Sequence, residues 1–471
     1  MIESKRPIRG WRQTPAARAF ALFAAVTVAV NTGPAAPVGA QELAGVPMIR
    51  DAEIEQLLRD YSKPILQAAG LGQQNIHVII INDRSFNAFV MDGRRIFVNA
   101  GALMDAQTPN QIIGVLAHET GHIAGGHLSR MREQLAAAQT QSIIAMLLGV
   151  GAMVATARSG NVGGNPTAAI LGPQDAIMRS LLSYQRAQEE QADRAGVKFL
   201  TATGQSAKGM YDTFKRFADQ ILFAARYSDP YVQSHPMPAE RVAALEVIAR
   251  TNPYWDKKDP PELQLRHDLM RAKLSGFMER PDTVARRYPQ NDTSLPARYA
   301  RAISTYRHSD LRAAIAQIDS LIQAQPNNPY FYELKGQALL EGGRPAEAIS
   351  SLRHAAQIAP QPALIQVLLA QALIATNKRE VADEAVAMLR VALTREPDVP
   401  DGYTQLAMAY GRKGDLAQAD LASAQAAAAR GDLKTARELG ARAKNRFPVG
   451  SPGWVKADDL ASTNPKPLRP N

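Results

Sequence analysis

The sequence contains no cysteine, which excludes disulfides, thiolate zinc sites and cysteine nucleophiles. Any metal ion in this protein must therefore be held by histidines and carboxylates. Aromatic residues are also few, at 6% of the chain, and alanine-rich stretches dominate the C-terminal third, which favours closely packed helices there over a β-sandwich. With 471 residues, of which 46% are apolar and 21% charged, the chain is long enough for two or three globular domains and is not disordered throughout.

The N-terminal segment lacks an apolar run long enough to span a membrane. Residues 1–18 carry five basic side chains and one acidic one, an apolar run follows at 19–30, and a small-x-small site lies at 38–40. This is the pattern of a secretory signal peptide, and the apolar run falls short of the roughly 20 residues of a membrane span. We therefore expect residues 1–40 to be cleaved and the protein to reach a bacterial periplasm; an N-terminal anchor is the alternative. The remaining net charge of about +6 gives little reason to expect a nucleic acid partner.

Residues 41–255 are expected to form a first domain of helices around a small sheet. Apolar residues at helical spacing and short β-branched runs predict its elements, and Asp92-Gly93 between two β-prone runs predicts a hairpin. Thr108 and Gln111 form a capping box with Pro109 at the first helical position. The expected elements are a helix at 50–70, a strand at 76–81, a hairpin at 86–99, a helix from 112 to about 131, a helix at 174–200 and a helix from about 238.

Residues 143–157 form a second apolar stretch, which at fifteen residues is too short to cross a bilayer. One interpretation is a buried helix or helical hairpin. The other is a lid or a membrane-surface element near the catalytic cleft, giving peripheral membrane contact.

The chain repeats from about residue 293 to 460. Prolines recur at 326, 360 and 397, separated by 34 and then 37 residues, and each follows small and apolar residues at fixed offsets. This period resembles the tetratricopeptide repeat, an α-solenoid with a concave surface for peptides or proteins. A purely structural buttress is the alternative. The segment 256–292 is expected to be a linker or helical connection. The residues at the fixed offsets are Ala314, Ala348 and Ala385, then Ile318, Leu352 and Leu389, then Leu321, Ala355 and Ala392.

A metal-binding motif lies in the predicted helix 112–131. His118 and His122 are four residues apart, hence on one face, where two imidazoles can bind a single Zn²⁺. Glu119 can reach a zinc-bound water and take its proton, producing a hydroxide for attack on a peptide carbonyl. This is the logic of the H-E-x-x-H motif of zinc peptidases.

The third ligand decides the subclass of peptidase. A metzincin requires a histidine at position 128, which is Leu128. On an ideal helix His127 would lie about 140° around the axis from His122, so we expect a packing or surface residue there.

A downstream helix offers a better third ligand, as in gluzincins. Glu189 and Asp193 share one helix face, and the small residues Ala192 and Gly196 would allow close approach to the first helix. We assign Glu189 as the third ligand and expect Asp193 to accept a hydrogen bond from a ligand imidazole, which would fix its tautomer. A solvated charged face is the alternative.

The remaining histidines are less informative. His235 precedes a proline at a helix entrance, so it is a cap or packing residue, a fourth ligand or an oxyanion donor; spacing alone leaves these open. The others have no motif context and are expected to be structural: His77, His267, His308 and His354.

Four motifs together resemble a known family. They are Asn87-Ala88-Phe89 in the hairpin, V-L-A-H-E-T-G-H at 115–122, E-x-x-A-D at 189–193 and H-P-x-P-x-x-R at 235–241. This order is similar to the zinc peptidase family of CAAX prenyl proteases and HtpX. The resemblance implies a mainly α zincin-type domain in which the matching residues act as follows: His118, His122 and Glu189 bind zinc, Glu119 is the catalytic base, Asp193 supports catalysis as a proton donor, and Arg241 lies near the active site.

The signal peptide and the repeats narrow the resemblance to exported members of the family. In these the histidine matching His235 caps the zinc and keeps the enzyme latent. They degrade stalled outer-membrane β-barrel precursors, assist the maturation of others, and contact the β-barrel assembly machinery through their repeats. A hairpin edge beside the zinc would bind an extended substrate by β-addition.

Two further functions compete with this one. The first is a chaperone-like adaptor with a latent or vestigial metal site. The second is an integral membrane protease anchored by residues 19–30 and 143–157.

Overall fold

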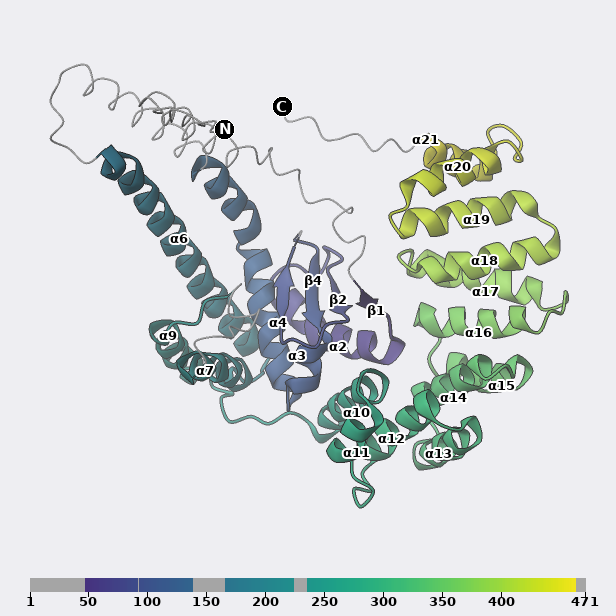
Figure 1. Ribbon diagram of the computed structural model, residues 1–471, viewed down its shortest axis with the longest axis horizontal. Helices are drawn as coiled ribbons and strands as arrows, with labels where there is room; N and C mark the ends of the chain where they lie inside the picture. Colours follow the sequence, from purple (N-terminus) through teal and green to yellow (C-terminus); the bar gives the residue numbers. More distant parts are fainter. Residues whose placement is uncertain (1–46, 92, 139–165, 224–234, 463–471) are drawn as a thin grey trace, which may run out of the picture. The chain divides into compact units, whose positions relative to one another are not determined.

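The computed structural model describes residues 47–91, 93–138, 166–223 and 235–462 (Figure 1). The predicted signal peptide at 1–40 and the apolar stretch at 143–157 lie outside these ranges. Within them, no helix combines the length and the apolar character that crossing a membrane requires.

The N-terminal part is built of helices around one small sheet. Its elements are β1 (Met48–Ile49), α2 (Ala52–Ala68), β2 (His77–Ile81), β3 (Ala88–Val90), β4 (Arg95–Asn99), α3 (Ala100–Asp105), α4 (Pro109–Ala124), α6 (Pro166–Ala202), α7 (Lys208–Phe223) and α9 (Ala239–Arg250).

Helices make up all the described elements that follow. They are α10 (Pro261–Met278), α11 (Pro281–Arg287), α12 (Leu295–His308), α13 (Leu311–Ala324), α14 (Pro329–Glu341), α15 (Pro345–Ile358), α16 (Ala363–Ala375), α17 (Ala382–Arg395), α18 (Pro400–Lys413), α19 (Leu416–Ala429), α20 (Leu433–Lys444) and α21 (Pro452–Ser462).

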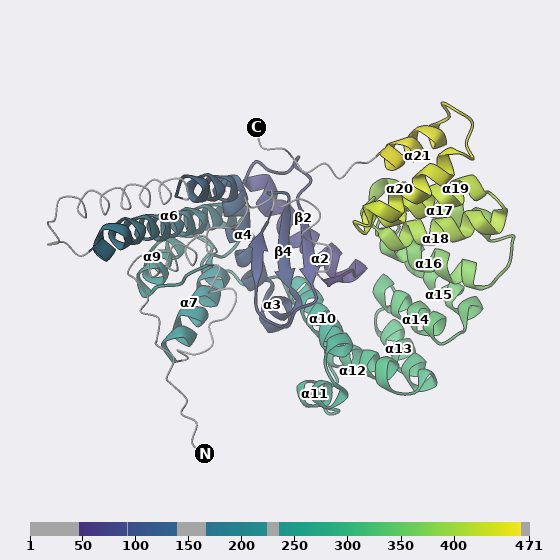
Figure 2. The same ribbon diagram turned by 45° about the horizontal axis from the view of Figure 1, so that its top comes forward.

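The sheet has four strands in the order β1-β2-β4-β3. The predicted strand and hairpin are confirmed, since β3 pairs antiparallel with β4 while β2 pairs parallel with β4. Helices α2 and α4 contact the sheet (Figure 2). Strand β3 is therefore an edge strand, with one side paired to β4 and the other unpaired within the described sheet, and it contacts the helix that carries the H-E-x-x-H motif.

Helix α2 forms where the apolar spacing predicts it. Asp51 caps its N-terminus by accepting a hydrogen bond from the Ile54 N–H at 3.0 Å. The helix buries the whole predicted stripe, including Leu66. The members that lie in the core shared with the sheet and α4 are Ile54, Leu57, Leu58, Tyr61 and Ile65.

The start of α4 differs from the expected capping box. The side chain of Thr108 makes no cap hydrogen bond, and Gln111 Oε1 accepts from the Gln107 N–H at 2.6 Å. A distant carboxylate caps the helix instead, because the Asn110 N–H donates to Oδ2 of Asp259 at 3.0 Å. The cap thus depends on the tertiary fold and cannot be identified from local sequence.

The end of α4 also differs from the expectation of one helix reaching residue 131. The helix ends at Ala124, and Gly126 adopts a left-handed conformation with φ of 62°. Residues 127–138 are helical again. Because a left-handed residue breaks the helical path, side chains after Gly126 do not follow the angular spacing of one ideal helix.

Helices α4 and α6 pack at very close range (Figure 1). A Cβ atom at Gly121 would lie 2.8 Å from the carbonyl oxygen of Ala192, and one at Gly196 would lie 3.3 Å from the backbone of Ala117. The close approach predicted from the small residues of α6 is confirmed, and Gly121 is its counterpart on α4.

We expect Gly121→Ala to destabilise the protein by about 1–3 kcal/mol, because the added methyl group forces the two helix backbones apart. Urea unfolding followed by circular dichroism measures the change. The control is Gly411→Ala in α18, where an added Cβ meets nothing within 4 Å and better helix propensity favours the variant slightly. Equal stability of Gly121→Ala and the native protein would contradict the close packing.

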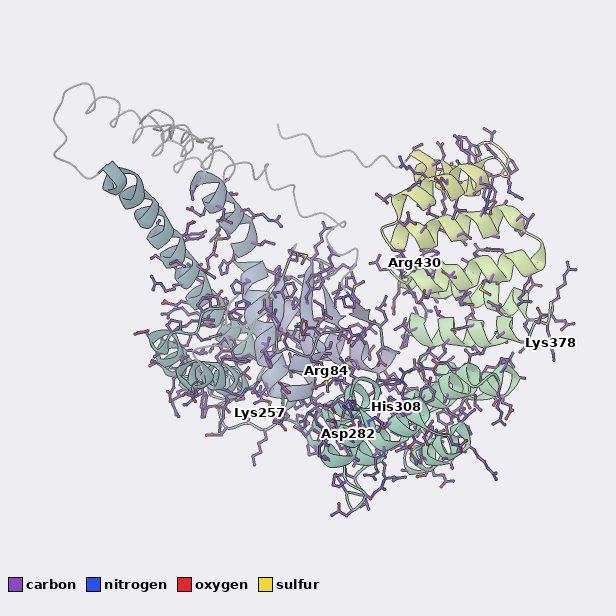
Figure 3. All side chains as sticks on the ribbon, in the orientation of Figure 1. Arg84, Lys257, Asp282, His308, Lys378 and Arg430 are labelled. Carbon is purple, nitrogen blue, oxygen red and sulfur yellow. The ribbon has the colours of Figure 1, made fainter. Side chains whose placement is uncertain are left out.

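The repeat helices bury the residues that define the sequence period. All nine predicted positions are buried on α13, α15 and α17. Helix α12 ends at His308, whose side chain is exposed (Figure 3). The C-terminal helices are also regular, and Asp415 and Asp432 cap α19 and α20 with their side chains.

Helix α10 belongs to two apolar clusters. Met270 and Leu274 pack into the core of the sheet and α4, whereas Leu269 and Ala272 pack with the first repeat helices. The predicted connection at 256–292 is therefore helical, and its longest helix contributes side chains to both cores.

Lys273 of the same helix is buried among acidic side chains. Its Nζ lies 2.7 Å from Asp51 Oδ2 and 3.2 Å from Glu53 Oε2, and the Tyr299 hydroxyl donates to the same Glu53 oxygen at 2.9 Å. These contacts join α10 to the start of α2 and to α12.

Candidate metal centre

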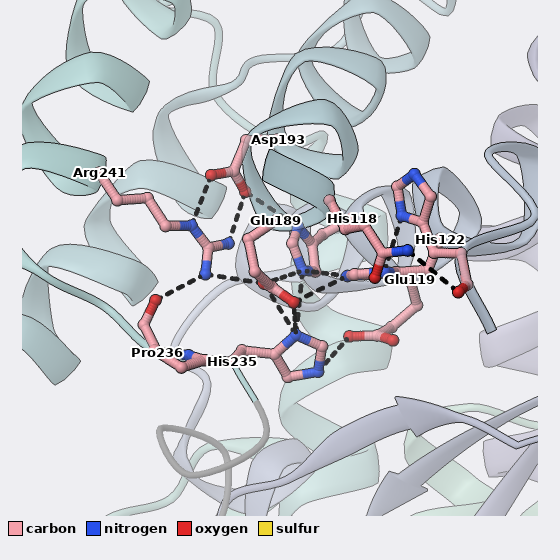
Figure 4. Close-up of polar contacts among 10 residues, drawn as sticks. His118, Glu119, His122, Glu189, Asp193, His235, Pro236 and Arg241 are labelled. Carbon is pink, nitrogen blue, oxygen red and sulfur yellow. Dashed lines mark hydrogen bonds and ion pairs between the residues drawn. The ribbon is translucent and has the colours of Figure 1, made fainter. Parts of the chain in front are cut away.

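The candidate site lies where α4 and α6 approach each other. His118 and His122 project from one face of α4, and their Nε2 atoms are 3.1 Å apart (Figure 4). His118 is completely buried, and its ring packs edge-on against Phe214 of α7. The packing fixes the plane of the imidazole.

Glu189 of α6 reaches the same point. Its Oε2 lies 3.4 Å from His118 Nε2, and its Oε1 lies 3.5 Å from His122 Nε2. His235 precedes α9 and places its Nδ1 3.1 Å from Glu189 Oε2 and 3.3 Å from His118 Nε2. The structure thus brings the predicted ligands and His235 together, with all four ligand atoms within 4.8 Å of one another.

These separations fit a tetrahedral metal site. Metal bonds of 2.0–2.1 Å in a tetrahedron place neighbouring ligand atoms about 3.3 Å apart. The five separations given above span 3.1 to 3.5 Å and agree with that spacing, while the four ligand atoms as a set lie within 4.8 Å of one another. The side chains present therefore suit a small four-coordinate ion.

The charge of the buried groups also suits a dication. Glu119, Glu189 and Asp193 are three buried carboxylates, and among the described residues Arg241 is the one buried guanidinium beside them, so these four groups carry a formal excess of two negative charges. Burial opposes charging of His118, but its interactions with Asp193 and Glu189 raise its pKa to about 9. A carboxylate environment that draws a proton to an imidazole favours a bound cation for the same reason.

Arg241 of α9 orients the acidic side chains of α6. Its Nε and Nη2 donate to the two oxygens of Asp193 at 2.7 and 2.8 Å, and its Nη1 lies 2.7 Å from Glu189 Oε2. Burial opposes ionisation of both acids, but His235 and Arg241 hold the pKa of Glu189 well below its usual range, and Arg241 lowers that of Asp193. Both acids are therefore anionic at neutral pH.

Asp193 contacts the outer nitrogen of His118, which is the ring nitrogen that faces away from the other ligands. Its Oδ1 lies 2.9 Å from Nδ1 of His118, whose Nε2 faces the other ligands. The distance suits the expected hydrogen bond, but His118 Nδ1 makes no well-aligned hydrogen bond with any described residue, so that bond stays a prediction. With Nδ1 turned to Asp193, Nε2 is the nitrogen available to a metal.

Glu119 is a buried acid to which no described residue donates a hydrogen bond. Neither of its carboxylate oxygens has a hydrogen-bond partner among the described residues, and His235 Nε2 lies 3.5 Å from Oε1. Burial raises its pKa. A buried carboxylate with no hydrogen-bond donors, next to a cluster of metal ligands, is suited to act as a general base. It can accept the proton of a water molecule bound to the metal.

His127 is a packing residue, one of the two roles expected for it, although the helix does not continue to it as the ideal-helix argument assumed. It is buried, and its Nδ1 lies 3.0 Å from His122 Nδ1, although it is not one of the four clustered ligands. The Gly125-Gly126 pair is the sequence signal that the helix would break before it. Phe214 has no sequence signal, because its place under His118 depends on how α7 packs.

His267 lies apart from the site, in the core. The Tyr61 hydroxyl is 3.0 Å from its Nδ1, and its Nε2 lies 2.9 Å from the carbonyl oxygen of Ala106. Burial lowers its pKa to about 4, so it is neutral. These contacts agree with the structural role expected from the sequence.

Comparison with known proteins places both parts of the chain in families. The sequence model of "Peptidase family M48" matches residues 49–249, and a tetratricopeptide repeat model matches residues 299–363. Among solved structures, the match to the crystal structure of MamA covers 34% of this chain and 89% of the MamA chain, with 19% sequence identity and a TM-score of 0.28.

Curated relatives extend over most of the sequence. The β-barrel assembly-enhancing proteases of Yersinia pestis and Escherichia coli (strain K12) are 24% and 23% identical, over 87% and 86% of this chain and 83% and 82% of theirs. Metalloprotease LoiP of Escherichia coli (strain K12) is 30% identical over 39% of this chain and 68% of its own. With the H-E-x-x-H helix, the clustered ligands and these matches, the chain belongs to peptidase family M48 and is a metallopeptidase followed by tetratricopeptide repeats.

Proposed function

We propose that this protein is a zinc endopeptidase of the periplasm that hydrolyses misfolded or stalled outer-membrane protein precursors. The observation that carries the proposal is the cluster of His118, His122, Glu189 and His235, whose ligand atoms lie within 4.8 Å of one another, beside Glu119, whose carboxylate has no hydrogen-bond partner among the described residues. Two imidazoles and a carboxylate are the donor set of catalytic zinc. The names of the curated relatives support the substrate class.

Each residue has a distinct part in the proposed reaction. Zinc, when bound by His118, His122 and Glu189, supplies a Lewis acid that polarises the scissile carbonyl and acidifies water. Glu119 accepts the proton of the attacking water and returns it to the departing amine. Asp193 fixes the tautomer of His118 and remains anionic beside Arg241, so its chief role is orientation rather than proton donation.

His235 occupies the position at the metal site that a water molecule or a substrate would need. Catalytic zinc sites keep a position open for water or substrate. Here His235 Nδ1 stands within 3.1–3.3 Å of ligand atoms from both α4 and α6, and thus in the position of a fourth ligand. We infer that His235 must move before a peptide can bind, which would make the resting enzyme latent.

We expect Glu119→Gln to lower kcat by about 10²–10⁴-fold while keeping one zinc per chain, because the amide cannot take a proton. Glu189→Ala should lose most of the zinc. Elemental analysis and cleavage of an unfolded β-barrel protein measure the two effects, and Glu240→Gln on the exposed start of α9 is the control. Undiminished cleavage by Glu119→Gln would rule out the assigned base.

The inferred latency is tested with His235→Ala, which removes the side chain from the position of a fourth ligand. This variant should cleave an unfolded substrate faster than the native protein, because the fourth position becomes open. The comparison uses initial rates at equal zinc content, with exposed His354→Ala as the matched control. A variant that binds no zinc would instead make His235 an obligatory ligand and contradict the latency.

Strand β3 offers a binding edge for the substrate backbone. The Asn99 N–H donates to the carbonyl oxygen of Asn87 at 2.9 Å, so alternation turns the backbone groups of Ala88 and Val90 toward the unpaired side. An extended peptide can add there by main-chain hydrogen bonds, largely independent of its sequence. Precursors of β-barrels are rich in such segments. Ala88 itself is fully buried, so its side chain is unsuitable for a test.

We expect Val90→Pro to raise KM by up to about tenfold with little loss of zinc, since it removes one outward donor worth about 0.5–1.5 kcal/mol. Val90→Thr keeps the N–H and is the matched control. Steady-state kinetics on an unfolded substrate provides the comparison. Equal KM values for the two variants would argue against β-addition at this edge.

The repeats are the proposed contact with the β-barrel assembly machinery. For residues 143–157 both predictions stand, a buried helix or helical hairpin and a site of peripheral membrane contact. A chaperone-like adaptor is the competing function. Glu119→Gln separates the two in cells, because an adaptor keeps its cellular activity without proteolysis whereas a protease loses it.

A further inference from the structure

His127 forms a contact with the metal centre that the ligand set does not require. Its side chain is only 3% exposed, and its Nδ1 lies 3.0 Å from Nδ1 of His122. His122 directs its other nitrogen, Nε2, toward His118 and Glu189. His127 therefore contacts the outer nitrogen of a ligand, as Asp193 does for His118.

The backbone around His127 is shaped for this contact. Gly126, with φ of 62°, reverses the helical path directly after α4 and brings residue 127 back toward His122. A Cβ on Gly125 would lie 2.2 Å from His127 Nε2, so the ring occupies space that only glycine leaves open. The buried Gln188 donates its Nε2 hydrogen to the carbonyl oxygen of His127 at 3.2 Å, which ties the turn to the residue before Glu189.

The proton on His122 follows from its use of Nε2. A neutral imidazole that offers Nε2 to a metal carries its hydrogen on Nδ1, and that N–H needs an acceptor. His127 Nδ1 is at hydrogen-bond distance and can accept it when His127 carries its own hydrogen on Nε2, which is buried without a hydrogen-bond partner among the described residues. Such partners orient a ligand ring and raise its basicity.

We propose that His127 is a positioning residue that accepts the Nδ1–H of His122 and fixes its ring for metal binding. The inference rests on the proposed zinc site. It gives each of the two ligand imidazoles a dedicated partner: a carboxylate for the deeply buried His118 and a neutral imidazole for the more accessible His122.

The test is zinc affinity of the purified full chain, measured by competition with a chromophoric chelator. His127→Ala should bind zinc about 10–100-fold more weakly than the native protein. His127→Asn places an amide oxygen near the position of Nδ1 and should recover part of the loss. The matched control, His308→Ala, removes an exposed histidine and should leave affinity unchanged.

A second variant tests the contact without removing His127. Gly125→Ala keeps the α-helical backbone of that residue but displaces the ring, so it should weaken zinc binding to a similar extent. The double variant should be no weaker than His127→Ala, since both changes remove the same interaction. Absorption of the Co²⁺-loaded proteins should report altered ligand geometry in each. Gly125→Ala also keeps the test valid if His127→Ala fails to fold.

The outcomes distinguish this inference from the proposed function. Native affinity in His127→Ala and Gly125→Ala would overturn the positioning role and leave the zinc site intact. A folded native protein that binds no zinc would overturn both. A lower melting temperature of His127→Ala with unchanged zinc affinity would show a purely structural residue and also overturn the proposal.

Discussion

The buried excess of negative charge between α4 and α6 is the constraint on which the rest of the site depends. Burying a carboxylate is costly unless opposite charge or hydrogen bonds accompany it. Arg241 offsets one charge and locks the geometry of Asp193 and Glu189. The remainder requires protons or a dication, so metal binding also serves the stability of this core. The close helix packing at Gly121 places the acids within reach of the histidines.

The sequence predicted those features that depend on local periodicity. Helix α2, the hairpin and the repeat helices follow from apolar spacing and turn residues, and their predicted buried positions are buried. The ligand cluster was predictable because two short motifs, each on one helix, carry its members. His235 could not be decided from spacing, because its position depends on the chain preceding α9 rather than on a helical period.

The features that escaped prediction are set by contacts between distant residues or by one unusual backbone angle. Asp259 caps α4 from almost 150 positions away, which no capping rule can identify. The environment of His127 depends on Gly126 being left-handed, because an uninterrupted helix would turn that side chain away from His122. In both cases the residue types were visible, but their geometry belongs to the tertiary fold.

The position of helix α10 in the sequence affects the order in which the two parts of the protein can fold. A chain that is exported N-terminus first can fold domain by domain as its segments become available. Met270 and Leu274 complete the core around the sheet and α4, yet they lie beyond every residue of the metal centre. The peptidase core is thus unfinished until residues past α9 are available. The same helix, α10, also packs against the first repeat helices, so one helix completes the peptidase core and begins the repeat core.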